Sequence, residues 1–299
     1  MKIASHELID ELMFLVNTSI RTSKFATTWK YVKVLPGFKN KGRRCDAKFY
    51  SPITNQSEIS KLPERAIYNQ VYSYLSTNNL IHENHHGFLQ GCSTSTGQQQ
   101  IVDFWMKSLD KGKLSAALFL DLSAGFDVVN HSILLDKLKE YGFDESAINW
   151  FKSYLEDRHQ CVQVESAFSQ FLPVRWGVPQ GSILWPLIFL IYINELPALV
   201  EKLPEETHGD EYEKNATIVI YADDNTPSSS HENPTELQRD MQKIANDVVN
   251  WLEDNDMVIN GDKTKLLTIG TVANKRSKHL NNLEIEIQNK FTVETSSEK

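Results

Sequence analysis

Hydrophobic residues recur along this chain with two different periods, and the two periods predict a mixture of helices and strands. Spacings of three and four residues are typical of amphipathic helices, whereas short β-branched and aromatic runs are typical of strands. Helices are expected at residues 5–20, 58–80, 98–109, 128–141, 146–157, 183–196 and 234–253. Strands are expected at residues 29–35, 116–121, 160–164, 168–174, 218–222, 266–269 and 283–287.

Proline and glycine mark the expected ends of several elements. Pro36 and Gly37 should end the strand 29–35, and Pro227 should stop any regular continuation after the strand 218–222. The hydroxyl-rich segment 93–96 offers caps for the helix that follows it. The pattern shows no internal repeat, so the chain is expected to form separate short elements joined by turns.

Two of the predicted strands end in carboxylates. Residues 218–222 lead directly into Asp223 and Asp224, and residues 116–120 lead into Asp121. Adjacent carboxylates after a buried strand repel each other, and a bound cation would remove that cost. If the two strand ends converge, they suit a pair of Mg²⁺ ions that clamp both oxygens of an in-line phosphoryl displacement. The alternative is that each aspartate is an ordinary turn or cap residue, and for Asp121 alone neither interpretation is favoured.

Two loops carry residues suited to contact a ligand. The turn 177–182 contains two glycines and a proline and precedes an apolar helix, so a ligand could approach its backbone closely. The segment 39–44 is densely basic and continues to Lys48. A solvated loop is the usual explanation for such a run of charge. On these grounds alone the role of both loops stays open.

The composition is that of an ordinary globular protein, with 299 residues, 40% of them hydrophobic and 23% charged. This length suits one large domain or two ordinary ones. The net charge of −8 argues against a protein that coats nucleic acid through bulk charge, although it leaves room for local basic grooves. Three scattered cysteines, no signal-peptide pattern and no apolar run long enough to span a bilayer predict a soluble, intracellular protein without membrane contact.

Three sequence blocks occur in a specific order. They are Phe-Leu-Asp-Leu-Ser-Ala-Gly-Phe-Asp at 119–127, Gly-Val-Pro-Gln-Gly-Ser at 177–182 and Tyr-Ala-Asp-Asp at 221–224. A predicted helix and then Lys263 follow the last block. With these motifs, the chain from about Trp29 to Lys299 resembles the reverse transcriptase of non-LTR (LINE-like, jockey-type) retrotransposons.

The resemblance implies an α+β right-hand polymerase with fingers and a palm, in which helices pack on the palm sheet. Residues 1–28 would form a helical extension, 29–115 the fingers, and 116–270 the palm, with an exposed acidic linker at 201–215. Residues 271–299 would be a truncated end of the palm. The thumb that follows in the family is expected to be missing, as is an upstream endonuclease domain.

The resemblance also implies the chemistry. Asp121 and Asp223 would coordinate two Mg²⁺ ions, with Mn²⁺ as the alternative ion. Asp224 would support them, and the backbone carbonyl of Leu122 would complete one metal shell. Lys263 would approach the triphosphate as a cation or proton donor, unless it is an ordinary surface lysine. The primer 3′-oxygen would attack the α-phosphate of a deoxynucleoside triphosphate, and pyrophosphate would leave.

Other residues would contact the substrates, which are an RNA template, a DNA primer and deoxynucleoside triphosphates. Phe126 would be the steric gate that excludes a ribose 2′-hydroxyl, and Gln180 and Gly181 would lie beside the nascent base pair. Arg43 and Arg44 would touch the template backbone or the triphosphate. Outside the family, Phe126 would be plain core and Gln180 a turn residue.

Several positions depart from the family pattern. Ser51 stands before Pro52 where an arginine is common, which removes a triphosphate contact unless the basic loop compensates. Trp185 stands where glycine is usual and would crowd the nucleotide pocket or the palm, and Gly125 stands where alanine is common. Three hypotheses follow: an RNA-directed DNA polymerase module, a catalytically inactive remnant that keeps the palm fold and weak nucleic-acid binding, and an unrelated metal-dependent phosphotransferase.

Overall fold

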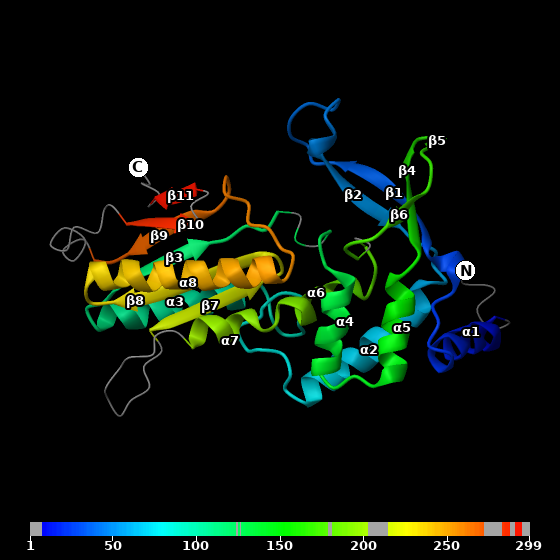
Figure 1. Ribbon diagram of the computed structural model, residues 1–299, viewed down its shortest axis with the longest axis horizontal. Helices are drawn as coiled ribbons and strands as arrows, with labels where there is room; N and C mark the ends of the chain where they lie inside the picture. Colours follow the sequence, from blue (N-terminus) through cyan, green and yellow to red (C-terminus); the bar gives the residue numbers. More distant parts are fainter. Residues whose placement is uncertain are drawn as a thin grey trace. The chain divides into compact units, whose positions relative to one another are not determined.

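The computed structural model describes residues 8–123, 125, 127–178, 181–202, 215–271, 283–287 and 291–294. The chain divides into two compact units, residues 1–80 with 126–191 and residues 81–125 with 192–299. Helices and strands occur in both units, which confirms the predicted α+β class (Figure 1). The predicted boundaries between fingers and palm separate the functional parts of a polymerase and not the compact units of the chain, so they stay a prediction.

The first unit combines a small mixed sheet with helices. Its helices are α1 (Ile9–Arg21), α2 (Lys61–Thr77), α4 (His131–Glu140) and α5 (Glu145–Leu155), with 3-10 turns η1 (Thr27–Trp29) and η2 (Ala47–Phe49). Its strands are β1 (Tyr31–Phe38), β2 (Tyr50–Asn55), β4 (Arg158–Val164), β5 (Ala167–Phe168) and β6 (Leu172–Val174). β1 pairs antiparallel with β2 and parallel with β4, while β5 and β6 both pair with β4. Exposure alternates along β1, so Val32 and Val34 face the interior.

β1 does not end at Pro36 and Gly37, so this expectation was wrong. The strand continues to Phe38, and Pro36 lies opposite Pro52 of β2. β1 pairs with β4 only as far as Val34, and beyond that residue β2 is its partner. A proline is tolerated on such an edge, because no carbonyl of a neighbouring strand is there to accept the backbone N–H that proline lacks.

The second unit is built on an antiparallel sheet in the order β7-β8-β3-β9. These strands are β3 (Leu114–Phe119), β7 (Ala216–Tyr221), β8 (Asp224–His231) and β9 (Lys265–Ile269), and the helices are α3 (Thr94–Asp110), α7 (Leu196–Glu201) and α8 (Pro234–Asp254). β10 (Glu284–Ile287), which the pattern predicts, forms a hairpin with β11 (Phe291–Glu294), which the pattern does not indicate.

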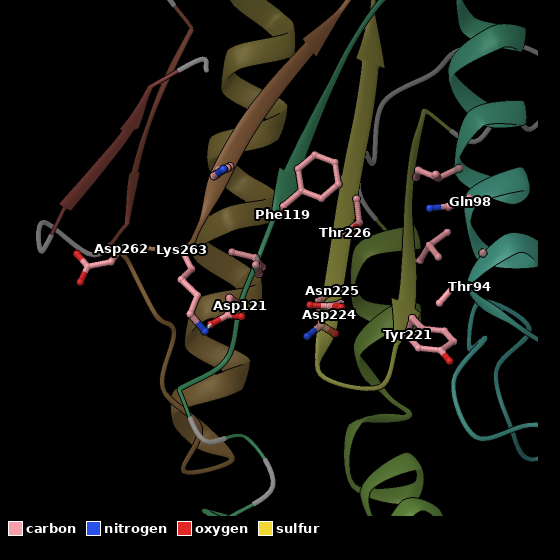
Figure 2. A pocket seen from close by; sticks show the side chains of 15 residues that line it. Thr94, Gln98, Phe119, Asp121, Tyr221, Asp224, Asn225, Thr226, Asp262 and Lys263 are labelled. Carbon is pink, nitrogen blue, oxygen red and sulfur yellow. Dashed lines mark hydrogen bonds and ion pairs between the residues drawn. The ribbon is translucent and has the colours of Figure 1, made fainter. Parts of the chain in front are cut away.

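Helices cover the sheet of the second unit on both faces. α8 buries an apolar stripe and lies behind the sheet in Figure 2, whereas the side chains of Phe119 and Thr226 point to the opposite side. On that opposite side α3 closely approaches β7 through Gly97, and the Trp105 indole donates to the Ser228 hydroxyl at 3.4 Å. The candidate site lies on this face, where the first half of α3 and Asp121 line the same cavity.

The strand after the paired aspartates is regular, which corrects the expectation that Pro227 stops it. β8 runs from Asp224 to His231, with Pro227 paired opposite Ile218 of β7. Asn225 exchanges two backbone hydrogen bonds with Leu120 beyond β3, so Pro227, two residues later, also directs its backbone toward β3. The β3–β8 pairs resume only at Ser228, and the gap between them accommodates the missing N–H.

The apolar segment predicted as one helix at 183–196 forms α6 (Trp185–Ile193), which contains residues of both units, followed by the short α7. Among the described residues, no helix combines the length and the hydrophobicity needed to cross a bilayer. Most of the predicted acidic linker, residues 203–214, lies outside the described residues.

Candidate active site

A tight hairpin between β7 and β8 carries the paired aspartates. Tyr221 pairs with Asp224, so Ala222 and Asp223 form a two-residue turn. Ala222 has a φ of 55°, a conformation that favours glycine and costs a residue with a Cβ about 1–2 kcal/mol. Backbone strain of this kind gathers at functional sites, where the surrounding structure holds it in place.

Asp121 lies beside this hairpin because the chain continues past β3 in register. Leu120 pairs with Asn225, and extending that antiparallel register by one residue sets Asp121 opposite Asp224. On the other side, the Asp121 carbonyl accepts the Asn260 N–H at 2.8 Å. Backbone hydrogen bonds on both sides therefore fix the strand end that bears Asp121.

The same hydrogen bonds orient the Leu122 carbonyl. Successive carbonyls of a strand point to opposite sides. The Asp121 carbonyl points to Asn260, so the Leu122 carbonyl points the other way, as the Leu120 backbone does when it bonds Asn225. Leu122 thus presents its carbonyl oxygen toward the side of the hairpin, where a metal ligand is predicted.

Lys263 brings a positive charge to the carboxylates. Its Nζ lies 2.9 Å from Asp121 Oδ2, and this hydrogen bond raises the pKa of the lysine (Figure 2). Burial raises the pKa of Asp223. The negative charges of Asp224 and Asp121 raise this pKa further, and the positive charge of Lys263 lowers it. Burial and, to a lesser extent, the Asp121 charge raise the pKa of Asp224, whereas the Lys263 charge lowers it. The charges of neighbouring carboxylates therefore raise the pKa values of both Asp223 and Asp224.

The donor set suits Mg²⁺, which prefers carboxylate, carbonyl and water oxygens. Within the described ranges, however, no three histidine, cysteine, aspartate or glutamate side chains gather closely enough to hold a metal ion. The Asp121 carboxylate is instead paired with Lys263. A cation bound here would relieve the repulsion between the aspartates that Lys263 now offsets.

A cavity of about 670 Å³ opens beside the carboxylates. Asp121, Asp224 and Lys263 line one end of it, and Phe119 and Tyr221 add two partly exposed rings (Figure 2). Residues from α3, β3, β7, β8 and β9 contribute to the wall, so the whole cavity belongs to the second unit. It combines acidic, basic and aromatic groups, a mixture that can contact a charged ligand with flat rings.

The other predicted substrate contacts fall in the first unit or outside the described residues. Arg43 and Arg44 lie in the exposed loop between β1 and β2, where the Arg44 guanidinium lies 5.3 Å from the centre of the Phe38 ring. Gly181 belongs to the same unit and has a φ of 106°. Phe126 and Gln180 lie outside the described residues. The structure thus brings together Asp121, Asp224 and Lys263, with Asp223 in the adjoining turn.

Two residues that depart from the family pattern have ordinary surroundings. Trp185 begins α6, where its ring stacks on Phe189 with 6.4 Å between the ring centroids, and its backbone N–H donates to the Ser182 hydroxyl at 3.0 Å. Ser51 lies in β2 opposite Gly37. Trp185 is therefore accommodated within its own helix.

The sequence reasoning missed a segment that supports the hairpin from outside. Ile220 donates to the Asn84 carbonyl at 3.0 Å and its own carbonyl accepts from the His86 N–H at 2.8 Å, so residues 84–87 meet β7 through one parallel bridge. Gly87 then lies against the turn, since a Cβ on it would be 2.4 Å from Ala222 N. A glycine flanked by histidine and phenylalanine was the available signal, because such a glycine often marks a close backbone approach.

Comparison with known proteins agrees with this architecture. Residues 39–291 match the family described as Reverse transcriptase (RNA-dependent DNA polymerase). A probable RNA-directed DNA polymerase from transposon BS of Drosophila melanogaster is 30% identical over 253 residues, which are 85% of this chain and 27% of that protein. The RNA-directed DNA polymerase from mobile element jockey of the same species is 25% identical over 86% of this chain and 27% of its own length.

Solved structures show the same fold at lower sequence identity. Apo telomerase from Candida tropicalis, truncated from its C-terminal domain, superposes with a TM-score of 0.56 at 14% identity, over 82% of this chain and 51% of that one. The chain spans about a quarter of the length of the two transposon polymerases. The predicted resemblance is confirmed, and the chain belongs to the reverse transcriptase family, with relatives among the non-LTR retrotransposon polymerases.

Proposed function

We propose that this chain catalyses RNA-directed DNA synthesis, in which a primer 3′-oxygen attacks the α-phosphate of a deoxynucleoside triphosphate and pyrophosphate leaves. The observation that carries this proposal is the convergence of Asp121, Asp223 and Asp224 at neighbouring strand ends, with Lys263 paired to Asp121. Family membership supports the same reaction. Family membership also makes an unrelated phosphotransferase unnecessary.

In this proposal each carboxylate has a part. Asp121 and Asp223, with the Leu122 carbonyl, would hold two Mg²⁺ ions, and Mn²⁺ is the alternative ion. When bound, the ions lower the charge on the reacting phosphate and orient the attacking and leaving oxygens. Asp224 keeps the site acidic beside Asp121, and Lys263 leaves Asp121 to meet the triphosphate. Positioning and electrostatics supply most of the rate in phosphoryl transfer of this kind.

The substrates are proposed on the same basis. An RNA template and a DNA primer would meet at the carboxylate end of the second unit. Gln180 and Gly181 would contact the nascent base pair, and Phe126 would exclude a ribose nucleotide. Arg43 and Arg44 would contact the triphosphate or the template backbone in place of the arginine that Ser51 replaces.

The test is Mg²⁺-dependent extension of a DNA primer on an RNA template. Asp223→Asn should abolish extension, because a metal ligand and its charge are lost. Asp103→Asn is the matched control, because Asp103 is an exposed aspartate of α3 in the same unit, and it should extend normally. No extension by the unaltered chain, with nucleic-acid binding retained, would instead favour the catalytically inactive remnant.

A further inference from the structure

A buried carboxylate lies in the first unit, whereas the metal-site aspartates belong to the second. Glu64 of α2 is 0% exposed, and its Oε2 accepts the N–H of Ile183 at 2.8 Å. Burial raises the pKa of the Glu64 carboxyl, while the Ile183 N–H and the Arg158 guanidinium act against that rise. A charged side chain is almost never fully buried without a specific partner, so this position requires a reason.

The partner of Glu64 is the end of a turn. Ile183 directly follows the turn 177–182 and lies two residues before α6, and a buried backbone N–H there needs an acceptor from elsewhere. Ser182 caps Trp185 from within the turn. Glu64 satisfies Ile183 from a different helix, so α2 is tied to the downstream end of the turn.

The upstream end of the turn is held as well. Gly177 donates its N–H to the Val129 carbonyl at 2.9 Å, and its own carbonyl accepts a hydrogen bond from His131 Nε2 at 2.8 Å. A Cβ on Gly177 would lie 2.6 Å from the Asp127 carbonyl oxygen. Gly177 at one end of the turn and Ile183 just after the other end are therefore both held by residues of the same unit.

Arg158 supplies the opposite charge. It is 1% exposed, donates from Nη1 to the Tyr154 carbonyl at 3.0 Å, and lies with its guanidinium carbon 4.8 Å from the centre of the Tyr154 ring. Among the described residues its Nε and Nη2 make no hydrogen bond. It lines a cavity of about 290 Å³ together with Gly177 and Val178 of the turn. The buried cation thus lies beside the turn, and its charge lowers the pKa of the Glu64 carboxyl.

We propose that Glu64 is a positioning residue for nucleotide selection: by accepting the Ile183 N–H, it holds the downstream end of the turn 177–182 next to Gly181, which the proposed function assigns to the nascent base pair. The link to nucleotides depends on the proposed polymerase function, whereas the restraint on the turn does not. Removing the carboxylate takes away the acceptor of the Ile183 N–H, which directly follows the turn.

The test has one arm that needs no activity. In the full chain without nucleic acid, hydrogen exchange at the Ile183 amide should accelerate at least about tenfold in Glu64→Ala, because its acceptor is lost. Glu64→Gln keeps an acceptor oxygen of similar shape and should retain most of the protection. The control is Glu58→Ala, an exposed glutamate paired with Lys61, which should change nothing. Unchanged exchange at Ile183 in Glu64→Ala would overturn the proposal.

The second arm is kinetic. In primer extension, Glu64→Ala should raise the KM for deoxynucleoside triphosphate about tenfold and change kcat by less than about threefold, with partial rescue in Glu64→Gln. A mere loss of folded protein would lower the active fraction without moving KM. An equal fall in kcat with constant KM would overturn the role in nucleotide selection. Absence of extension by the unaltered chain would refute the proposed function, and hydrogen exchange would still decide whether Glu64 holds the turn.

Arg158 is tested by a double-mutant cycle. Glu64→Gln alone leaves a buried cation without its countercharge, so its Tm should fall, and adding Arg158→Met should recover part of that loss. Additive losses in the double variant would show that Arg158 is not the countercharge.

Discussion

Gly87 offers the sharpest test of how the catalytic hairpin is held. A Cβ at this position would lie 2.4 Å from Ala222 N, 3.2 Å from Ala222 Cα and 3.3 Å from the carbonyl carbon of Tyr221, whereas ordinary contacts begin at 3.4 Å. All three atoms are backbone, so no side-chain rotation can relieve the clash. Gly87→Ala must therefore move the segment and the turn apart by about 1 Å.

The expected cost follows from where the turn lies. Asp223 comes next after Ala222, so a shift of this size reaches a predicted metal ligand directly. Overpacking of this kind costs roughly 1–3 kcal/mol of stability. A misplacement of about 1 Å in a catalytic geometry can lower the rate by about 100-fold. We expect Gly87→Ala to fold, with reduced stability, and to extend a primer about 100 times more slowly.

The assay is single-turnover primer extension at saturating nucleotide and Mg²⁺, with urea unfolding measured in parallel. Gly112→Ala is the matched control, because Gly112 precedes β3 at a φ of 73° with no atom within 4 Å of an added Cβ. It should lose about 1 kcal/mol through backbone strain alone and keep its rate. If Gly87→Ala extends within twofold of the unaltered chain, the turn does not depend on this contact and the reasoning fails.

Three further changes should give distinct results. Lys263→Met removes a charge that lowers the pKa values of the hairpin carboxylates, so the acid limb of the pH–rate profile should move to higher pH. Asp224→Asn removes repulsion from Asp121 and should add about 0.5 kcal/mol to the free energy of unfolding at pH 7. Because the pKa of Asp224 is raised in the folded chain, its protonation relieves the same repulsion, and the unaltered chain should become more stable as the pH falls toward 3.8. Urea unfolding of the Asn variant should lack this dependence of stability on pH. Trp185→Gly loses the stack on Phe189 and places glycine in α6, so its Tm should fall. Its primer extension should not increase, and an increase would show that Trp185 is a lesion that glycine repairs.

Local patterns predicted those features that depend on nearby residues. The 3.6-residue period located α8, and the hydroxyls of Ser93 and Thr96 form the capping box that begins α3. Pro36 and Pro227 were misjudged, because a proline breaks a strand only where a neighbour needs its N–H. That depends on which strand lies on each side, and such pairing joins residues far apart in the sequence.

The residues of the candidate site also divide into those that local sequence patterns indicate and those that only the tertiary fold brings together. Asp121, Asp223 and Asp224 could be found because they follow short apolar runs within recognisable blocks. The segment that supports the hairpin was missed although Gly87 offered a weak signal, since Asn84 meets Ile220 only through the tertiary fold. A local signal was nevertheless available for such long-range restraints, and Glu64 shows what it looks like.

Glu64 precedes Ile67, Val71 and Leu75 at spacings of three, four and four residues, so it shares their buried stripe on α2. An acidic residue on the apolar stripe of a helix has to find a buried partner, and here that partner is an amide 119 residues away. Periodicity alone treats the position as an error in the pattern. Treated as a charge that the fold must satisfy, it predicts that α2 does more than pack, and it directs attention to whichever backbone groups lack an acceptor. In this chain those groups include the Ile183 N–H, which lies just before α6 and next to the turn that bears Gln180 and Gly181.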